Sequence, residues 1–147
     1  MGNLQHHDAT VRVRYAETDQ MGVVYHANYL VWFEVGRVEL MRALGVEYKT
    51  MEITDDCHIV VVNAHCRYLR PAHYDELLTI RTRIAESRNR TVTFAYELFR
   101  QGDGVLLATG ETTHVICGAN GHPKLLPAKY RTVLAVGGAT DSPRREA

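Results

Sequence analysis

The spacing of apolar residues along the chain predicts one long helix and several strands. Over residues 28–44 apolar side chains recur with a period of about 3.6 residues and spread beyond a single stripe, so the helix should be covered on most sides. Alternating apolar and polar residues predict strands over residues 10–15, 58–68, 76–84, 91–100 and 105–117. The predicted fold class is therefore α+β.

The order of these elements predicts how they pack. One strand before the helix and four after it suggest an antiparallel sheet that curls around the helix. Such a sheet has exposed edges, which an edge-to-edge dimer would cover. Residues 1–9 are expected to be a flexible N-terminus and residues 10–118 the folded domain. Residues 119–147 should be a partly disordered C-terminal extension, with a turn or short helix near 127–134 and disorder from about residue 137.

Charge and composition exclude several classes of function. Lys and Arg together number 17, as do Asp and Glu, so no net charge attracts nucleic acid or an anionic membrane. No apolar run approaches the roughly 20 residues of a spanning helix, and none resembles a signal peptide, so we expect no membrane insertion. The cysteines Cys57, Cys66 and Cys117 should be buried free thiols in a cytoplasmic protein. The eight histidines lack zinc-site spacing, so no metal is expected.

Candidate chemistry is concentrated in residues 15–29, which read Tyr-Ala-Glu-Thr-Asp-Gln-Met-Gly-Val-Val-Tyr-His-Ala-Asn-Tyr. This segment places the Asp19 carboxylate in a glycine-containing turn just before the predicted helix. The free N–H groups and positive dipole of a helix start can bind a carbonyl oxygen that gains negative charge. Asp19 could equally be a turn or N-cap aspartate, which is a common structural role.

The motif resembles the hotdog-fold thioesterases of the 4-hydroxybenzoyl-CoA thioesterase type, most closely the small bacterial acyl-CoA thioesterases associated with the Tol-Pal system. The likeness covers about residues 11–117. It is carried by residues 19–29, by Trp32-Phe33-Glu34, and by Tyr68-Leu69-Arg70-Pro71-Ala72 with Asp75 beyond. It implies a hotdog fold, in which a curved antiparallel sheet wraps around one long central helix. It also implies hydrolysis of an acyl-CoA to free acid and CoA, without a cofactor, by a homodimer or homotetramer.

In the resembling family the aspartate at the place of Asp19 is the catalytic carboxylate. It could attack the thioester carbonyl to form a mixed anhydride, or deprotonate a water that attacks, and the sequence leaves both routes open. The resemblance assigns the donor that polarises the carbonyl to the backbone N–H of Tyr25 or its neighbour. His26 could orient water, bind the substrate carbonyl or serve only the structure. Asn28 could cap the helix or hydrogen-bond the carboxylate.

Other polar residues have weaker claims. Glu17 is expected to be exposed to solvent rather than to be a second acid. His58 could line the acyl pocket or be a core or interface histidine. The turn Ser87-Arg88-Asn89-Arg90 could bind the phosphates of CoA, because guanidinium groups offer paired donors, or could be an ordinary solvated hairpin tip. Arg67 and Arg70 carry a weaker form of the same phosphate hypothesis.

Two other functions compete with hydrolysis. A hotdog hydratase or dehydratase would use a carboxylate and a histidine, such as Asp19 and His26, over the α and β carbons of the substrate. A non-catalytic acyl-CoA or acyl-carrier binding protein would have the same fold, although the intact Asp19 argues against it. The sequence leaves open whether the acyl group is short, long or aromatic.

Overall fold

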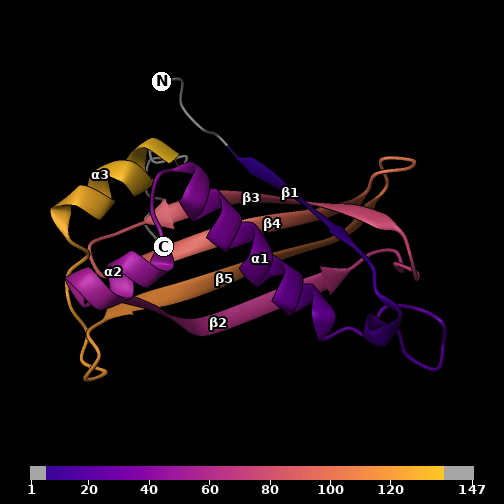
Figure 1. Cartoon of the computed structure of the whole chain (residues 1–147), viewed down its shortest axis with the longest axis horizontal. Coiled ribbons are helices and arrows are strands. Elements are labelled where there is room, and N and C mark those ends of the chain that lie inside the picture. The colour runs from indigo at the N-terminus through magenta and orange to yellow at the C-terminus, as the bar shows by residue number, and fades with distance from the viewer. Residues whose placement is uncertain (1–5, 138–147) are drawn as a thin grey trace, which may run out of the picture.

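The computed structural model describes residues 6–137, which form a five-stranded sheet wrapped around one long helix (Figure 1). The elements in chain order are β1 (His7–Arg12), the 3-10 turn η1 (Tyr15–Glu17), α1 (Asn28–Ala43), α2 (Tyr48–Asp55), β2 (His58–Tyr68), β3 (Leu77–Ser87), β4 (Thr91–Arg100), β5 (Leu106–Cys117) and α3 (Ala128–Gly137). The strand order is β1-β3-β4-β5-β2, and all neighbours are antiparallel. The fold class predicted from the sequence, with one central helix, is confirmed.

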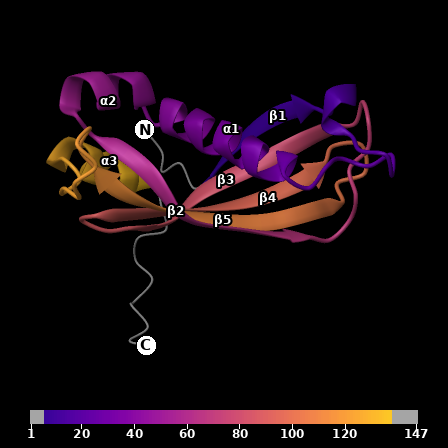
Figure 2. The ribbon, with the colours of Figure 1, turned by 90° about the horizontal axis from the view of Figure 1, so that it is seen from below.

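Helix α1 lies along one face of the sheet and approaches it closely (Figure 2). Gly36 permits this approach, since a Cβ atom there would lie 2.3 Å from Thr82 Oγ1 on β3. Gly110 on β5 does the same from the sheet side, since its Cβ would lie 2.4 Å from a ring carbon of Phe33. The Phe33 ring stacks on Tyr96 of β4 with centroids 4.4 Å apart. The core is therefore the layer between α1 and the sheet.

Three features differ from the sequence-based expectations. Strand β1 begins at His7, so residues 7–9 pair with β3 and do not belong to a flexible end. Helix α2 was not predicted, because it has only eight residues and buries only Met51, which leaves no helical repeat to detect. Helix α3 extends the helix expected near residues 127–134, and its Tyr130 and Leu134 are buried in the core. The disorder expected beyond residue 137 falls outside the described residues.

The two ends of the sheet carry different elements. The loop of residues 18–24 lies at one end, and α2, α3 and the turn between β3 and β4 lie at the other (Figure 1). Strand β3 runs between the two ends, and its 11 residues span about 35 Å. Strand β2 is an edge strand with three consecutive exposed valines, Val60, Val61 and Val62. Within residues 6–137, no helix is both long and apolar enough to cross a membrane.

Candidate active site

Asp19 lies in a tight loop whose hydrogen bonds fix its carboxylate. The Asp19 N–H donates to the Val23 carbonyl (2.9 Å), and the Gly22 N–H donates to the Asp19 carbonyl (3.0 Å). Gly22 has a φ of +79°, which favours glycine. Asp19 Oδ1 accepts the Met21 N–H at 2.8 Å, whereas Oδ2 has no hydrogen-bond partner among the described residues. Asp19 is thus a turn residue, and the N-cap position of α1 is occupied by Ala27. One carboxylate oxygen stays available for chemistry.

A pocket of about 340 Å³ lies beside this loop. Apolar and aromatic side chains make most of its wall, and Asp19, His26 and Arg70 are its polar members. The full lining comprises Asp19, Val23, Val24, His26, Tyr29, Tyr68, Leu69, Arg70 and Pro71. Asp19 and His26 are exposed to solvent in the single chain. The pocket therefore combines a free carboxylate oxygen with an apolar wall and one cation.

The start of α1 supplies backbone donors next to this pocket, but Tyr25 is not one of them. Its N–H already donates to the Glu17 carbonyl at 2.8 Å. The N–H groups of His26 and Ala27 donate to no acceptor within residues 6–137. The resemblance assigned the carbonyl donor to the backbone N–H of Tyr25 or its neighbour. The N–H of Tyr25 is occupied, so the available donors are those of His26 and Ala27.

Tyr68, at the end of β2, lines the same pocket and orients the backbone of His26. Its hydroxyl donates to the His26 carbonyl at 2.9 Å. Desolvation, with Cys66 nearby, raises the pKa of Tyr68 to about 12, so the hydroxyl remains a donor at neutral pH. The Tyr68 ring meets Tyr29 edge to face at 4.8 Å, and the His26 ring lies 4.6 Å from Tyr25. Tyr29 and Tyr68 belong to the two segments that carry the family resemblance, but the sequence alone gave neither residue a role.

Glu17 differs from the sequence-based expectation. Its side chain is buried, with 7% of the residue exposed, and it accepts hydrogen bonds from the Arg14 backbone N–H and the Trp32 indole N–H. Glu17 accepts the backbone N–H of Arg14, the residue before η1, as the glutamate of a capping box does, but arginine is not a capping residue and the sequence therefore gave no signal. Asn28 neither caps the helix nor contacts Asp19, because its side-chain N–H donates to the Glu17 carbonyl at 2.9 Å. Both residues thus hold the loop.

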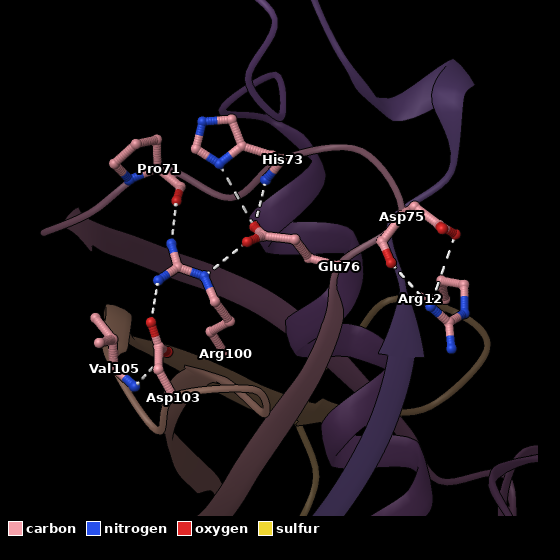
Figure 3. Close-up of polar contacts among 8 residues, drawn as sticks. All are labelled: Arg12, Pro71, His73, Asp75, Glu76, Arg100, Asp103 and Val105. Carbon is pink, nitrogen blue, oxygen red and sulfur yellow. Dashed lines mark hydrogen bonds and ion pairs between the residues drawn. The ribbon is translucent and has the colours of Figure 1, made fainter.

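An ionic cluster centred on Arg100 supports the part of the pocket wall that contains Pro71 (Figure 3). The Arg100 guanidinium donates to the Pro71 carbonyl at 3.1 Å, and its Nε lies 2.7 Å from the Glu76 carboxylate. Glu76 in turn accepts the His73 N–H at 2.6 Å. The next residue after Pro71, Ala72, accepts the Val24 N–H at 2.8 Å, which joins this wall to the Asp19 loop.

His58 and the turn at residues 87–90 lie at the opposite end of the sheet from Asp19 in the same chain. The His58 ring faces carboxylates, with Nε2 3.4 Å from Asp56 and Nδ1 3.8 Å from Glu52. In the turn, the Arg88 guanidinium pairs with Glu86, while Arg90 is exposed and has no side-chain partner among the described residues. A single chain therefore does not bring these candidates to the pocket.

The sequence-based expectations on metal ligands, cysteines and the weaker phosphate candidates can be compared with residues 6–137. No group of three or more His, Cys, Asp or Glu there could hold a metal ion. Cys57 and Cys117 are buried and Cys66 is half-buried, and all three are free thiols as predicted. Arg67 does not line the pocket, whereas Arg70 does.

Comparison with known proteins agrees with the motif. Residues 13–134 match the model of the family described as the thioesterase-like superfamily. The Bacillus subtilis protein named "Putative acyl-CoA thioesterase YneP" is 40% identical over 105 residues, 71% of this chain and 75% of that protein. The Haemophilus influenzae acyl-CoA thioesterase YbgC is 36% identical over 107 residues, 73% of this chain and 76% of that protein. A crystal structure named as a probable thioesterase from Bartonella henselae superposes with a TM-score of 0.77 at 33% identity, covering 83% of this chain and 99% of that one.

Proposed function

The chain belongs to the thioesterase-like superfamily, and on this premise we propose that it hydrolyses acyl-CoA thioesters, with Asp19 as the catalytic carboxylate. The observation that carries this proposal is the arrangement around Asp19. Met21 fixes one carboxylate oxygen and the other is free. His26, which lines the same pocket, and the adjoining Ala27 both have uncommitted N–H groups. A carboxylate can serve as the nucleophile or base in thioester hydrolysis, and free N–H groups at a helix start can stabilise the oxyanion.

The reaction follows from these groups. The thioester carbonyl oxygen would accept the N–H of His26 or Ala27, where the helix dipole favours the developing negative charge. Asp19 Oδ2 would then either attack the carbonyl carbon and expel the CoA thiolate, or take a proton from a water that attacks. In the first route, water hydrolyses the mixed anhydride and restores the carboxylate. The acyl group would lie against Tyr29 and Tyr68, and the His26 ring would close the pocket beside Tyr25.

A dimer formed through strand β2 explains the exposed surfaces of the single chain. Val60, Val61 and Val62 are exposed by 45%, 44% and 58% on an unpaired edge strand, an arrangement that invites pairing with a second strand. Leu30 and Val31 add apolar surface on α1, near the open pocket. Antiparallel pairing of two β2 strands about a two-fold axis would cover these residues and join two sheets into one.

The same dimer would bring the distant candidates to the pocket. In an antiparallel β2 pair, the beginning of one strand lies beside the end of the other. The end of the partner that carries His58 and the turn at residues 87–90 would then face the Asp19 end of the first chain. CoA phosphates would bind Arg90, with Ser87, Arg88 and Asn89 beside it, while Arg70 binds from the chain that supplies Asp19. Asn28 would contribute only by holding the loop.

Two broader proposals concern assembly and location. The outer face of the sheet, away from α1, surrounds a shallow cavity lined by charges of both signs, including Arg81, Arg83, Glu97 and Glu111. Packing of two dimers through this face would pair opposite charges and give a homotetramer. The three free cysteines favour a cytoplasmic location. Sedimentation at several protein concentrations tests the assembly, and a purely monomeric chain would contradict the β2 dimer.

The function is tested by thiol release from acyl-CoAs that range from acetyl to palmitoyl and include benzoyl and hydroxybenzoyl. Asp19→Asn should bind CoA with unchanged affinity and lower kcat on the order of 10²- to 10⁴-fold. Asp8→Asn is the matched control, because it neutralises an exposed aspartate that pairs with Arg81 on the edge of the sheet. Wild-type turnover by Asp19→Asn would exclude Asp19 as the catalytic carboxylate.

Phosphate binding is tested separately. Replacing Arg90 with Ala should raise KM for acyl-CoA, most strongly at low salt, and leave kcat nearly unchanged. Arg88→Ala should have a smaller effect, because its guanidinium is already paired with Glu86. An unchanged KM for the double variant Arg88→Ala, Arg90→Ala would contradict a phosphate site at this turn.

A further inference from the structure

We propose that Glu17 is a positioning residue for this reaction, whose buried carboxylate fixes the Asp19 loop against the start of helix α1. The proposal rests on the catalytic role of Asp19 proposed above. Glu17 would touch no substrate atom. It would act by setting the distance between the Asp19 carboxylate and the backbone N–H groups of His26 and Ala27.

The carboxylate of Glu17 joins three separate parts of the chain. Its Oε1 accepts the Arg14 backbone N–H at 2.7 Å, which ties it to the segment after β1. Its Oε2 accepts the indole N–H of Trp32 at 3.1 Å, which ties it to the second turn of α1. The Arg14 guanidinium lies 3.6 Å from the same oxygen. Trp32 is only 2% exposed, so this contact lies in the protein interior.

The backbone of Glu17 holds the loop as well. Its carbonyl accepts the Tyr25 N–H at 2.8 Å and the Asn28 side-chain N–H at 2.9 Å. The loop of residues 18–24 therefore leaves Glu17 and returns to it, and a bridge between Thr18 and Val24 closes its base. Asp19 is two residues from this junction, and His26 is one residue beyond Tyr25. Both reacting groups are thus set by one anchor.

The chemistry of the anchor requires a carboxylate. An ionised carboxylate only accepts hydrogen bonds, so it can satisfy the Arg14 N–H and the Trp32 indole N–H together. Glutamine has one acceptor oxygen and an NH2 group, so one of these donors would face another donor. A buried donor without an acceptor is costly, and the loop would shift to relieve it.

The consequence for catalysis is a loss of alignment rather than of binding. Misplacement of a reacting group by about 1 Å can lower a rate by about 10²-fold. The wall formed by Leu69, Arg70 and Pro71 is held by contacts with the Leu107 carbonyl and with Arg100, so substrate binding should change little. We therefore expect Glu17→Gln to lower kcat by roughly 10- to 100-fold with little change in KM. A residue that only stabilised the fold would leave kcat of the folded protein unchanged.

The experiment compares wild type, Glu17→Gln, Trp32→Phe, Asp19→Asn and the control Glu39→Gln. Glu39 is on α1 and pairs with Arg42 on the helix surface. Trp32 is the only tryptophan of the chain, so its emission reports directly on the indole contact. Glu17→Gln should shift this emission and lower kcat, whereas Glu39→Gln should change neither. Trp32→Phe removes the same hydrogen bond from the helix side and should lower kcat in the same way.

The possible results separate this proposal from the function on which it rests. A shifted Trp32 emission in Glu17→Gln with wild-type kcat would overturn the positioning role, provided that Asp19→Asn is inactive. If Glu17→Gln does not fold by circular dichroism, a folded Trp32→Phe with wild-type kcat and KM would overturn it equally. Full activity of Asp19→Asn would instead overturn the catalytic assignment itself.

Discussion

Acid is predicted to destabilise this protein through His114, a buried histidine on β5 outside the candidate active site. His114 has no exposed surface, its Nε2 lies 2.8 Å from the Thr112 hydroxyl, and its ring meets Phe94 edge to face at 5.3 Å. Burial, and secondarily the positive charge of Arg37, lowers the pKa of His114 from 6.5 to about 4. The folded state therefore keeps the imidazole neutral at pH values where the unfolded chain protonates it.

The sign and size of the effect follow from this difference in pKa. Between about pH 6.5 and pH 4 the unfolded state binds one more proton than the folded state, so the free energy of unfolding falls as the pH falls. Above this window both states are neutral at His114, and below it both are protonated. At 1.36 kcal/mol per pH unit, the loss over the whole window is about 3 kcal/mol.

Urea unfolding of wild type and His114→Gln tests this reasoning. Glutamine can keep the hydrogen bond to Thr112 but does not titrate. Between about pH 7 and about pH 4.5, wild type should lose roughly 2 kcal/mol more stability than the variant. The other histidines and the carboxylates are common to both proteins, and equal protein concentration removes differences in assembly. An equal loss of stability in both proteins would refute the role of His114.

Three further predictions test the packing around α1 and the pocket. Gly36→Ala should lower stability by about 1–3 kcal/mol in thermal unfolding, because its Cβ would overlap strand β3. Gly102→Ala has open space and should not lower stability. Equal effects of the two substitutions would contradict the close packing. Tyr68→Phe loses the hydrogen bond to the His26 carbonyl and should lower kcat roughly fivefold, the equivalent of about 1 kcal/mol. An unchanged kcat would contradict this role of the hydroxyl. Arg100→Met should cost about 2 kcal/mol of stability and raise KM, since the pocket wall loses its anchor; a wild-type KM and melting temperature would contradict this.

The sequence by itself determined the main elements and the location of the catalytic candidate. Strands β2 and β4 have the predicted bounds, and the predicted helix over residues 28–44 became α1, Asn28–Ala43. These elements are long and strongly periodic, so each segment shows its buried face in its own residues. Asp19 was placed correctly in a turn because Gly22 allows the positive φ that the turn needs. Local pattern and local backbone conformation were sufficient for these features.

The tertiary structure decided which polar groups are free and which are already in use. Glu17 is buried because Trp32, fifteen residues along the chain, covers and binds it. The Tyr25 N–H is unavailable because the loop returns to the Glu17 carbonyl. His58 and the turn at residues 87–90 lie far from Asp19 because of the strand order β1-β3-β4-β5-β2 and the antiparallel direction of each strand. Such contacts join residues distant in sequence, and their partners depend on how whole elements pack, which no local pattern of residues specifies.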